Sequence, residues 1–108
     1  MPAWLPRTLA RLRALVAARR VCFTEKAKAE LGALQLTTDD AVEILAMLGA
    51  RDAPSRVRSH RTDEWLYEFR PDVAGLGLYV KIALRHDCVV VSCHEDEAEK
   101  NRGADGIG

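Results

Sequence analysis

Four side chains that can transfer protons and bind anions cluster in the last third of this sequence. Tyr79 and Lys81 stand two residues apart in one alternating segment, and Ser92 and His94 stand two apart in the next. Side chains spaced in this way project from the same face of a β-strand. A phenol, an ammonium group and an imidazole held close together can transfer protons and neutralise a phosphate.

A β-hairpin would bring these four residues together. Residues 78–85 and 88–94 are interpreted as two strands with alternating faces, joined by a turn at residues 86–87. A loop over residues 85–88 would keep the same register. Side chains that are directly opposed across the two strands lie about 5 Å apart at Cβ. The expected pairs are Tyr79 with His94 and Lys81 with Ser92.

The other face of this predicted hairpin is apolar and indicates a core behind the polar cluster. Its residues are Leu78, Val80, Ile82 and Leu84. Cys88 and Cys93 stand five residues apart on one predicted strand, so we expect them on opposite faces. With Cys22 they make an odd number without regular spacing. This argues against a disulfide framework and favours the reduced thiols of a cytoplasmic protein.

The chain is neutral overall, but its charge is unevenly distributed. Residues 1–94 hold 14 Lys and Arg against 11 Asp and Glu, a net charge of +3, and four of the five residues 95–99 are acidic. We expect one domain over residues 1–94 and a flexible, acidic and Gly-rich tail over 95–108. A mildly basic domain permits an anionic partner. No apolar run approaches the ~20 residues needed to span a membrane.

Helical patterns fill the first half of the chain, and alternating patterns fill the second. The expected helices are residues 6–20, residues 25–34, and a segment from Thr37 or Thr38 to the stop at Gly49. Residues 21–24 are β-prone. The expected strands before the hairpin are residues 56–61 and 65–70, followed by a connection over 71–77. This order indicates an α+β domain with helices packed on one face of a small antiparallel sheet.

The sequence resembles the MqsR family, the motility quorum-sensing regulator toxins of bacterial type II toxin–antitoxin modules, over about residues 8–95. The motifs that carry the resemblance are Trp65, Phe69-Arg70-Pro71, Leu78-Tyr79-Val80-Lys81-Ile82, His86-Asp87 and Val89-Val90-Val91-Ser92. Their order and spacing match the family pattern without a gap from Trp65 to Ser92. The resemblance implies a RelE-like fold and an mRNA interferase that uses no metal or other cofactor.

In that family the ribose 2′-hydroxyl attacks the adjacent phosphate and leaves a cyclic phosphate. The site combines a basic residue before the sheet, an amide on the Trp strand, a Tyr, and a Lys at the end of the last strand. Carried over, the Tyr is Tyr79, and the Lys position is His94, which keeps a cation. Arg56 is our first choice for the basic residue, and Arg58 is the second. The amide position is Leu66, which cannot form an amide's hydrogen bonds.

We therefore expect an endoribonuclease toxin that cleaves single-stranded mRNA and is inhibited by a cognate antitoxin protein. Its expected catalytic residues are Tyr79, His94, Arg56 and Lys81. Its expected RNA-binding residues are Arg58, Arg70 and Arg85. No metal site is expected.

A non-catalytic RNA-binding or antitoxin-docking module on the same fold is the alternative. Leu66 favours this alternative, whereas Tyr79 together with a cation at His94 favours the enzyme. Each candidate also has a purely structural interpretation. Tyr79 can fill the sheet surface, His94 can end a strand, and Arg56 and Arg58 can protect an exposed strand edge.

Overall fold

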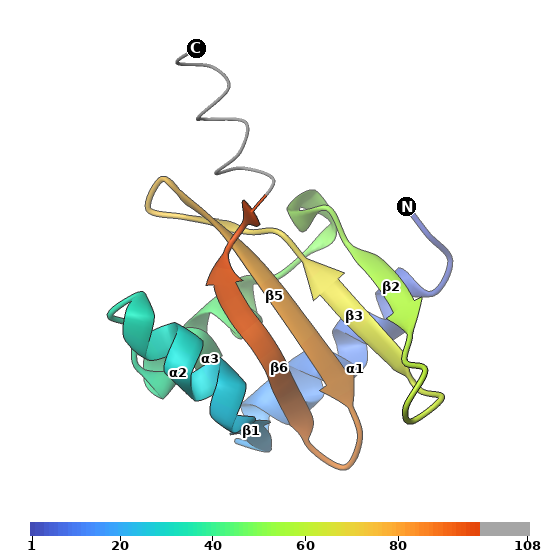
Figure 1. Ribbon diagram of the computed structural model, residues 1–108. Helices are drawn as coiled ribbons and strands as arrows, with labels where there is room; N and C mark the ends of the chain where they lie inside the picture. Colours follow the sequence, from blue (N-terminus) through green and yellow to red (C-terminus); the bar gives the residue numbers. More distant parts are fainter. Residues whose placement is uncertain (98–108) are drawn as a thin grey trace.

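The computed structural model describes residues 1–97, in which helices come first and most strands follow (Figure 1). The helices are α1 (Leu5–Ala17), α2 (Glu25–Ala33) and α3 (Thr38–Met47), followed by the short 3₁₀ turn η1 (Ala50–Asp52). The strands are β1 (Val21–Phe23), β2 (Ser55–Arg58), β3 (Trp65–Phe69), β4 (Asp72–Val73), β5 (Leu76–Leu84) and β6 (Cys88–Glu95). The predicted α+β class is confirmed. Of the predicted tail, all but the first three residues lies outside the described residues.

Capping residues mark the starts of α2 and α3, and a left-handed residue follows the end of α1. Thr37 and Asp40 form a capping box at the start of α3, with hydrogen bonds of 2.8 and 3.0 Å between each side chain and the other's backbone N–H. The hydroxyl of Thr24 caps α2. Helix α1 ends at Ala17, earlier than predicted, because Arg19 adopts a left-handed conformation with φ of 60° and closes the helix. Within residues 1–97, no helix is both long and apolar enough to cross a membrane.

The strands form one mixed sheet in the order β1-β6-β5-β3-β2, and β4 pairs with β5. Strands β2, β3, β5 and β6 make the predicted antiparallel meander. Strand β1 adds to the edge of β6 in parallel, with Val21 opposite Cys88 and Phe23 opposite Val90. Residues 21–24 were expected only to be β-prone, because a parallel partner so far along the chain leaves no local pattern.

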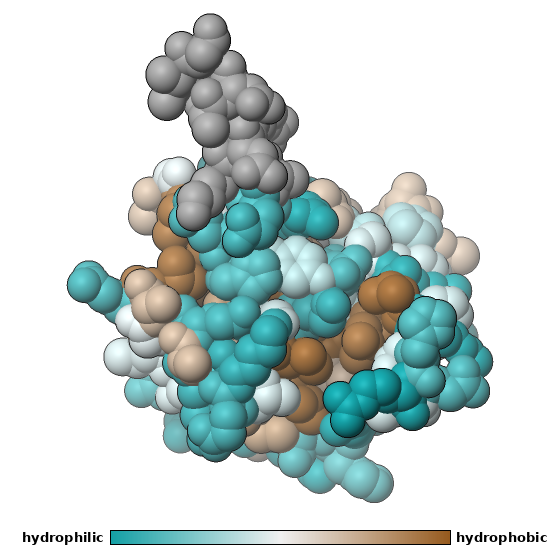
Figure 2. Space-filling view, in the orientation of Figure 1, coloured by the Kyte–Doolittle hydropathy of each residue, from teal (hydrophilic) through white to brown (hydrophobic). Residues whose placement is uncertain are grey.

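One face of the sheet is covered by helices, and the other is open. Helices α1 and α3 pack together behind the sheet, and α2 lies along β6 (Figure 1). The core between these layers includes Leu5, Leu12, Leu31, Leu45, Leu48, Phe69, Leu78, Val80, Ile82, Cys88, Val90 and Cys93. No helix of the described chain crosses the other face, which Figure 2 shows.

The β5–β6 hairpin has the predicted pairing near its open end and a different one near its turn. Leu84 lies opposite Cys88, so three residues form the connection instead of the expected two. The register then shifts between Ile82 and Lys81, because Val91 is an extra residue in β6 that forms a β-bulge. The hydroxyl of Thr24 donates to the Val91 carbonyl at 3.1 Å. The bulge restores the predicted register from this point to the end of the hairpin.

The same bulge overturns the prediction that Cys88 and Cys93 lie on opposite faces. An extra residue between them changes the alternation of side chains, and both thiols project into the core. Each is at most 2% exposed, whereas Cys22 on the edge strand β1 is exposed. All three cysteines are free. The prediction of unpaired thiols is therefore confirmed, and the prediction of their orientation is wrong.

Candidate active site

The open face of the sheet carries the predicted polar cluster at the end of the β5–β6 hairpin. Tyr79 lies directly opposite His94, and Lys81 lies opposite Ser92, as predicted. The rings of Tyr79 and His94 stack with centroids 5.0 Å apart and planes inclined by 29°. A shallow hollow of about 380 Å³ lies over these residues. Its lining residues are Lys26, Arg70, Tyr79, Lys81, Ser92, His94, Asp96 and Glu97.

The imidazole of His94 is held by the backbone of its own strand. Its Nδ1 lies 2.7 Å from the carbonyl oxygen of Glu95. Because a carbonyl oxygen can only accept a hydrogen bond, Nδ1 carries the proton of this contact. Nε2 is then the nitrogen through which His94 can exchange a proton with a ligand in the hollow.

Glu68 is a member of the cluster that the sequence interpretation missed. It lies opposite Lys81 in the pairing of β3 with β5, and its carboxylate is 3.9 Å from the Lys81 ammonium. The Tyr79 hydroxyl donates to Oε2 of Glu68, and the Ser55 hydroxyl donates to Oε1 at 3.0 Å. Alternation along β3 predicts that Glu68 and Leu66 project from the same face of the sheet. The sequence does not show that Tyr79 projects from this face too, because that depends on how β3 pairs with β5.

The environment of Tyr79 keeps its phenol protonated. Burial is the largest cause, and the hydrogen bond and negative charge of Glu68 add to it, so the pKa of Tyr79 is raised above its ordinary value. At neutral pH, Tyr79 is therefore a hydroxyl group that donates to Glu68, and its oxygen can accept a hydrogen bond from a ligand.

A lysine from the helical layer completes the cationic surface of the hollow. Lys26, in the first turn of α2, places its ammonium 2.7 Å from the Ser92 hydroxyl and 3.4 Å from the Glu30 carboxylate. Glu30 also accepts the backbone N–H of Cys93 at 3.0 Å, which fastens α2 to the edge of β6. Nothing in the local sequence marks Lys26, because its position depends on how α2 packs along β6.

Arg70 reaches the cluster from the end of β3, as its predicted role requires. Its guanidinium carbon lies 5.1 Å from the centroid of the Tyr79 ring. It also binds the carboxylate of Asp96 at 2.6 Å, which ties the residues after β6 to the start of the β3–β4 connection. Arg70 is thus the third cation near the stacked rings, after Lys26 and Lys81. Each of the three is paired with a carboxylate, that of Asp96, Glu30 and Glu68 respectively.

Arg56 and Arg58, the two choices for the basic catalytic residue, lie outside the cluster. Arg56 pairs with Tyr67, whose side chain packs toward the core, so it projects from the helix side of the sheet. Its guanidinium lies 3.9 Å from the Trp65 ring centroid and 5.3 Å from that of Trp4. Arg58 lies over the same Trp65 ring at 4.8 Å. The structure therefore brings neither arginine to Tyr79 and His94.

Arg85 lies at the far end of β5, away from the stacked rings. Its guanidinium forms an ion pair with Glu64 at 2.5 Å. The hydrogen bond from Arg85 is the main reason why the pKa of Glu64 is lowered. Arg85 therefore sits in a surface ion pair rather than in the hollow.

The part of the open face next to the cluster is apolar. Its residues form a row across four neighbouring strands: Val57, Leu66, Ala83 and Val89. Figure 2 shows this apolar strip beside the hydrophilic surface. Leu66, at the position where the resemblance implies an amide, is thus part of an apolar surface.

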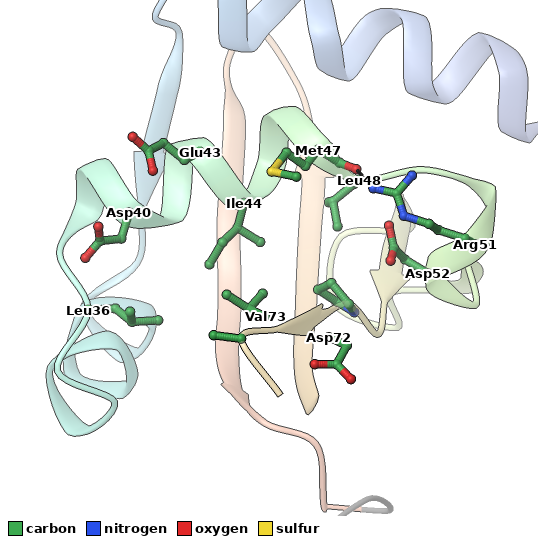
Figure 3. Close-up of a pocket in the computed structure, with 12 residues that line it drawn as sticks. Leu36, Asp40, Glu43, Ile44, Met47, Leu48, Arg51, Asp52, Asp72 and Val73 are labelled. Carbon is green, nitrogen blue, oxygen red and sulfur yellow. Dashed lines mark hydrogen bonds between the residues drawn. The ribbon is translucent and has the colours of Figure 1, made fainter. Parts of the chain in front are cut away.

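A second hollow lies on the helix side, between α3 and β4 (Figure 3). Ile44 and Val73 point toward each other across it, and Asp40 and Glu43 stand at its rim. Within residues 1–97, no three His, Cys, Asp or Glu side chains are arranged to hold a metal ion.

Comparison with known proteins identifies the family. No curated protein matches the chain in sequence. A family model described as "Motility quorum-sensing regulator, toxin of MqsA" matches residues 6–95, which include all the helices and strands except the first residue of α1. The chain therefore belongs to this family of toxins from toxin–antitoxin modules, whose members act with an antitoxin partner.

Proposed function

We propose that this toxin is an endoribonuclease that cleaves single-stranded mRNA without a metal ion. The observation that carries the proposal is the stack of Tyr79 on His94, with three cations and two carboxylates around it, on the open face of a toxin-family sheet. Three cations next to a phenol and an imidazole suit a phosphodiester that must be bound and protonated. The cations are Lys26, Arg70 and Lys81.

In the proposed reaction, the ribose 2′-hydroxyl loses its proton and its oxygen bonds to the adjacent phosphorus. The bond from phosphorus to the 5′-oxygen breaks, and Nε2 of His94 gives its proton to that leaving oxygen. The products are a 2′,3′-cyclic phosphate and a 5′-hydroxyl end. Lys81 and Arg70 neutralise the charge that develops on the phosphate oxygens.

The test is cleavage of a defined single-stranded RNA in EDTA by the wild type, Tyr79→Phe and His94→Ala. The expected result is cyclic-phosphate ends, and a rate at least about 10²-fold lower in each variant, as is typical when a general acid or base is lost. If the folded wild type cleaves none of a varied set of RNAs, alone or with ribosomes, the proposal is wrong.

A non-catalytic RNA-binding or antitoxin-docking module is the second candidate. The apolar row that contains Leu66 favours it, because apolar side chains on an uncovered sheet face are typical of a protein-binding surface. Val57 in this row is 40% exposed, Leu66 is partly exposed and Ala83 is buried. In that case the wild type would bind RNA or its antitoxin without cleaving RNA. Tyr79→Phe would then leave growth arrest by the toxin unchanged.

A further inference from the structure

The proposed reaction needs a group that takes the proton of the 2′-hydroxyl, and the described cations cannot do this. Lys26, Arg70 and Lys81 bear protons that they hold at neutral pH. Tyr79 is a neutral phenol whose pKa is raised, so it is not present as a phenolate. His94 is already assigned to the leaving oxygen. These residues therefore supply no base. Among the nearby carboxylates, Asp96 and Glu97 line the hollow and Asp96 is bound by Arg70, whereas Glu68 accepts the hydrogen bond of Tyr79.

We propose that Glu68 is this proton acceptor and that it acts through Tyr79. This proposal rests on the proposed function. As the 2′-hydroxyl gives its proton to the Tyr79 oxygen, the phenol proton moves along the existing hydrogen bond to Oε2 of Glu68. The 2′-oxygen then bonds to phosphorus, Tyr79 remains a neutral phenol, and Glu68 becomes a carboxylic acid. After product release, Glu68 returns this proton to water and His94 regains one.

The geometry around Glu68 suits this role. Its side chain is 20% exposed and does not line the hollow, whereas Tyr79 does, so a ligand reaches the carboxylate by way of the phenol. The Ser55 hydroxyl on Oε1 holds the carboxylate in place and leaves Oε2 to the phenol. Glu68 thus lies behind the reacting group, as the carboxylate of a catalytic triad does, but unlike that carboxylate it receives the proton of its partner.

The position of Lys81 connects this proton transfer to the phosphate. Its ammonium lies 3.9 Å from Oε2 of Glu68 and 5.8 Å from the centroid of the Tyr79 ring. While Glu68 is ionised, it partly neutralises Lys81. When Glu68 accepts a proton it loses its negative charge, so it no longer offsets the charge of Lys81. This happens as negative charge develops on the phosphate. Lys81 can then stabilise the transition state more strongly than the ground state, which is the requirement for catalysis.

Glu68→Gln tests the proposal, because an amide can still accept the Tyr79 hydrogen bond but cannot take its proton. Single-turnover cleavage of a defined RNA is measured from acid to alkaline pH. Binding is measured separately with a 2′-deoxy copy of the RNA, which cannot be attacked. The cleavage rate should fall by about 10²-fold or more with little change in binding, and the rise of the rate on the acid side of the profile should disappear.

Two further variants separate proton transfer from folding. Glu68→Asp keeps a carboxylate and should recover part of the rate together with the acid-side rise. Glu43→Gln makes the same chemical change on the exposed surface of α3 and should leave the profile unchanged. Thermal unfolding of each variant shows that the fold is retained.

The outcomes distinguish this proposal from the proposed function. An active wild type with an equally active Glu68→Gln variant would overturn the role of Glu68 and leave the ribonuclease in place. A slower Glu68→Gln variant that keeps the wild-type acid-side rise would also overturn it, because Glu68 would then only orient Tyr79. An inactive wild type would overturn the ribonuclease itself and this proposal with it.

Discussion

Tyr79 and His94 face each other across β5 and β6 with their ring centroids 5.0 Å apart. Given the three-residue connection at the turn, this contact depends on the bulge at Val91, because if Val91 paired regularly with β5, every later position of β6 would be one residue out of register. A one-residue slip would turn His94 toward the helix side. The phenol and the imidazole therefore share one surface because β6 is locally irregular.

His94→Gln tests the assignment of the proton donor to the leaving 5′-oxygen. Glutamine keeps a polar group of similar size but cannot act as an acid. We expect cleavage of a defined RNA to slow by about 10²-fold or more, while binding of the 2′-deoxy RNA changes much less. A variant with the wild-type rate would exclude His94 as the acid.

Lys26→Gln tests whether the α2 lysine contacts an RNA phosphate. Loss of one phosphate contact to a single strand should reduce the slope of log binding constant against log salt concentration by about 0.7. Lys28→Gln is the matched control, since Lys28 lies on the same helix, pairs with Glu25 at 3.5 Å and does not line the hollow. Fluorescence anisotropy with the 2′-deoxy RNA at several salt concentrations measures both. Equal slopes for the two variants would rule out a specific contact by Lys26.

Arg56→Ala should affect stability rather than catalysis. The guanidinium of Arg56 lies over the Trp65 and Trp4 rings on the helix side, away from Tyr79. Loss of an exposed cation–π contact should lower the free energy of unfolding by about 0.5–1 kcal/mol. Because Trp4 and Trp65 are the only two tryptophans in the chain, tryptophan emission will report the change. Loss of cleavage with normal stability would instead support the sequence-based choice of Arg56 as a catalytic residue.

The three thiols should differ in reactivity. Burial raises the pKa of Cys88 to about 12 and that of Cys93 to about 11, so both are protonated thiols at neutral pH. Because the thiolate is the reactive form, an alkylating reagent should modify only the exposed Cys22 in the native protein and all three residues in urea. Mass spectrometry counts the labels. Rapid native labelling of Cys93 would contradict its buried position.

The same two thiols predict how stability depends on pH. In the unfolded chain each ionises near its ordinary pKa of 9.0, whereas in the folded chain it keeps its proton to about pH 11 or 12. The folded state therefore binds more protons above pH 9, and the free energy of unfolding should fall as the pH rises through this range. Urea unfolding at pH 7 and 10 measures the change. Cys22→Ser should show the same fall, and a stability that rises over this range would refute the argument.

Local patterns in the sequence determined the helices and the alternation of β5. They also predicted the pairing of Tyr79 with His94, which the structure reaches through a longer turn and the bulge at Val91. These features depend on neighbours along the chain: a capping box at Thr37, alternation through β5, and the short distance between two consecutive strands. The same information sufficed to identify the family, whose characteristic residues lie in these segments.

The tertiary structure decided which other residues join the site, because those depend on contacts between distant segments. Glu68 faces Tyr79 only through the register of β3 with β5, and Lys26 reaches Ser92 only because α2 packs along β6. The pairing of β2 with β3 directs Arg56 to the helix side of the sheet, away from Tyr79. Shifting the pairing of a strand by one residue moves each of its side chains to the other face of the sheet. No local pattern encodes the register between segments that are far apart in the chain.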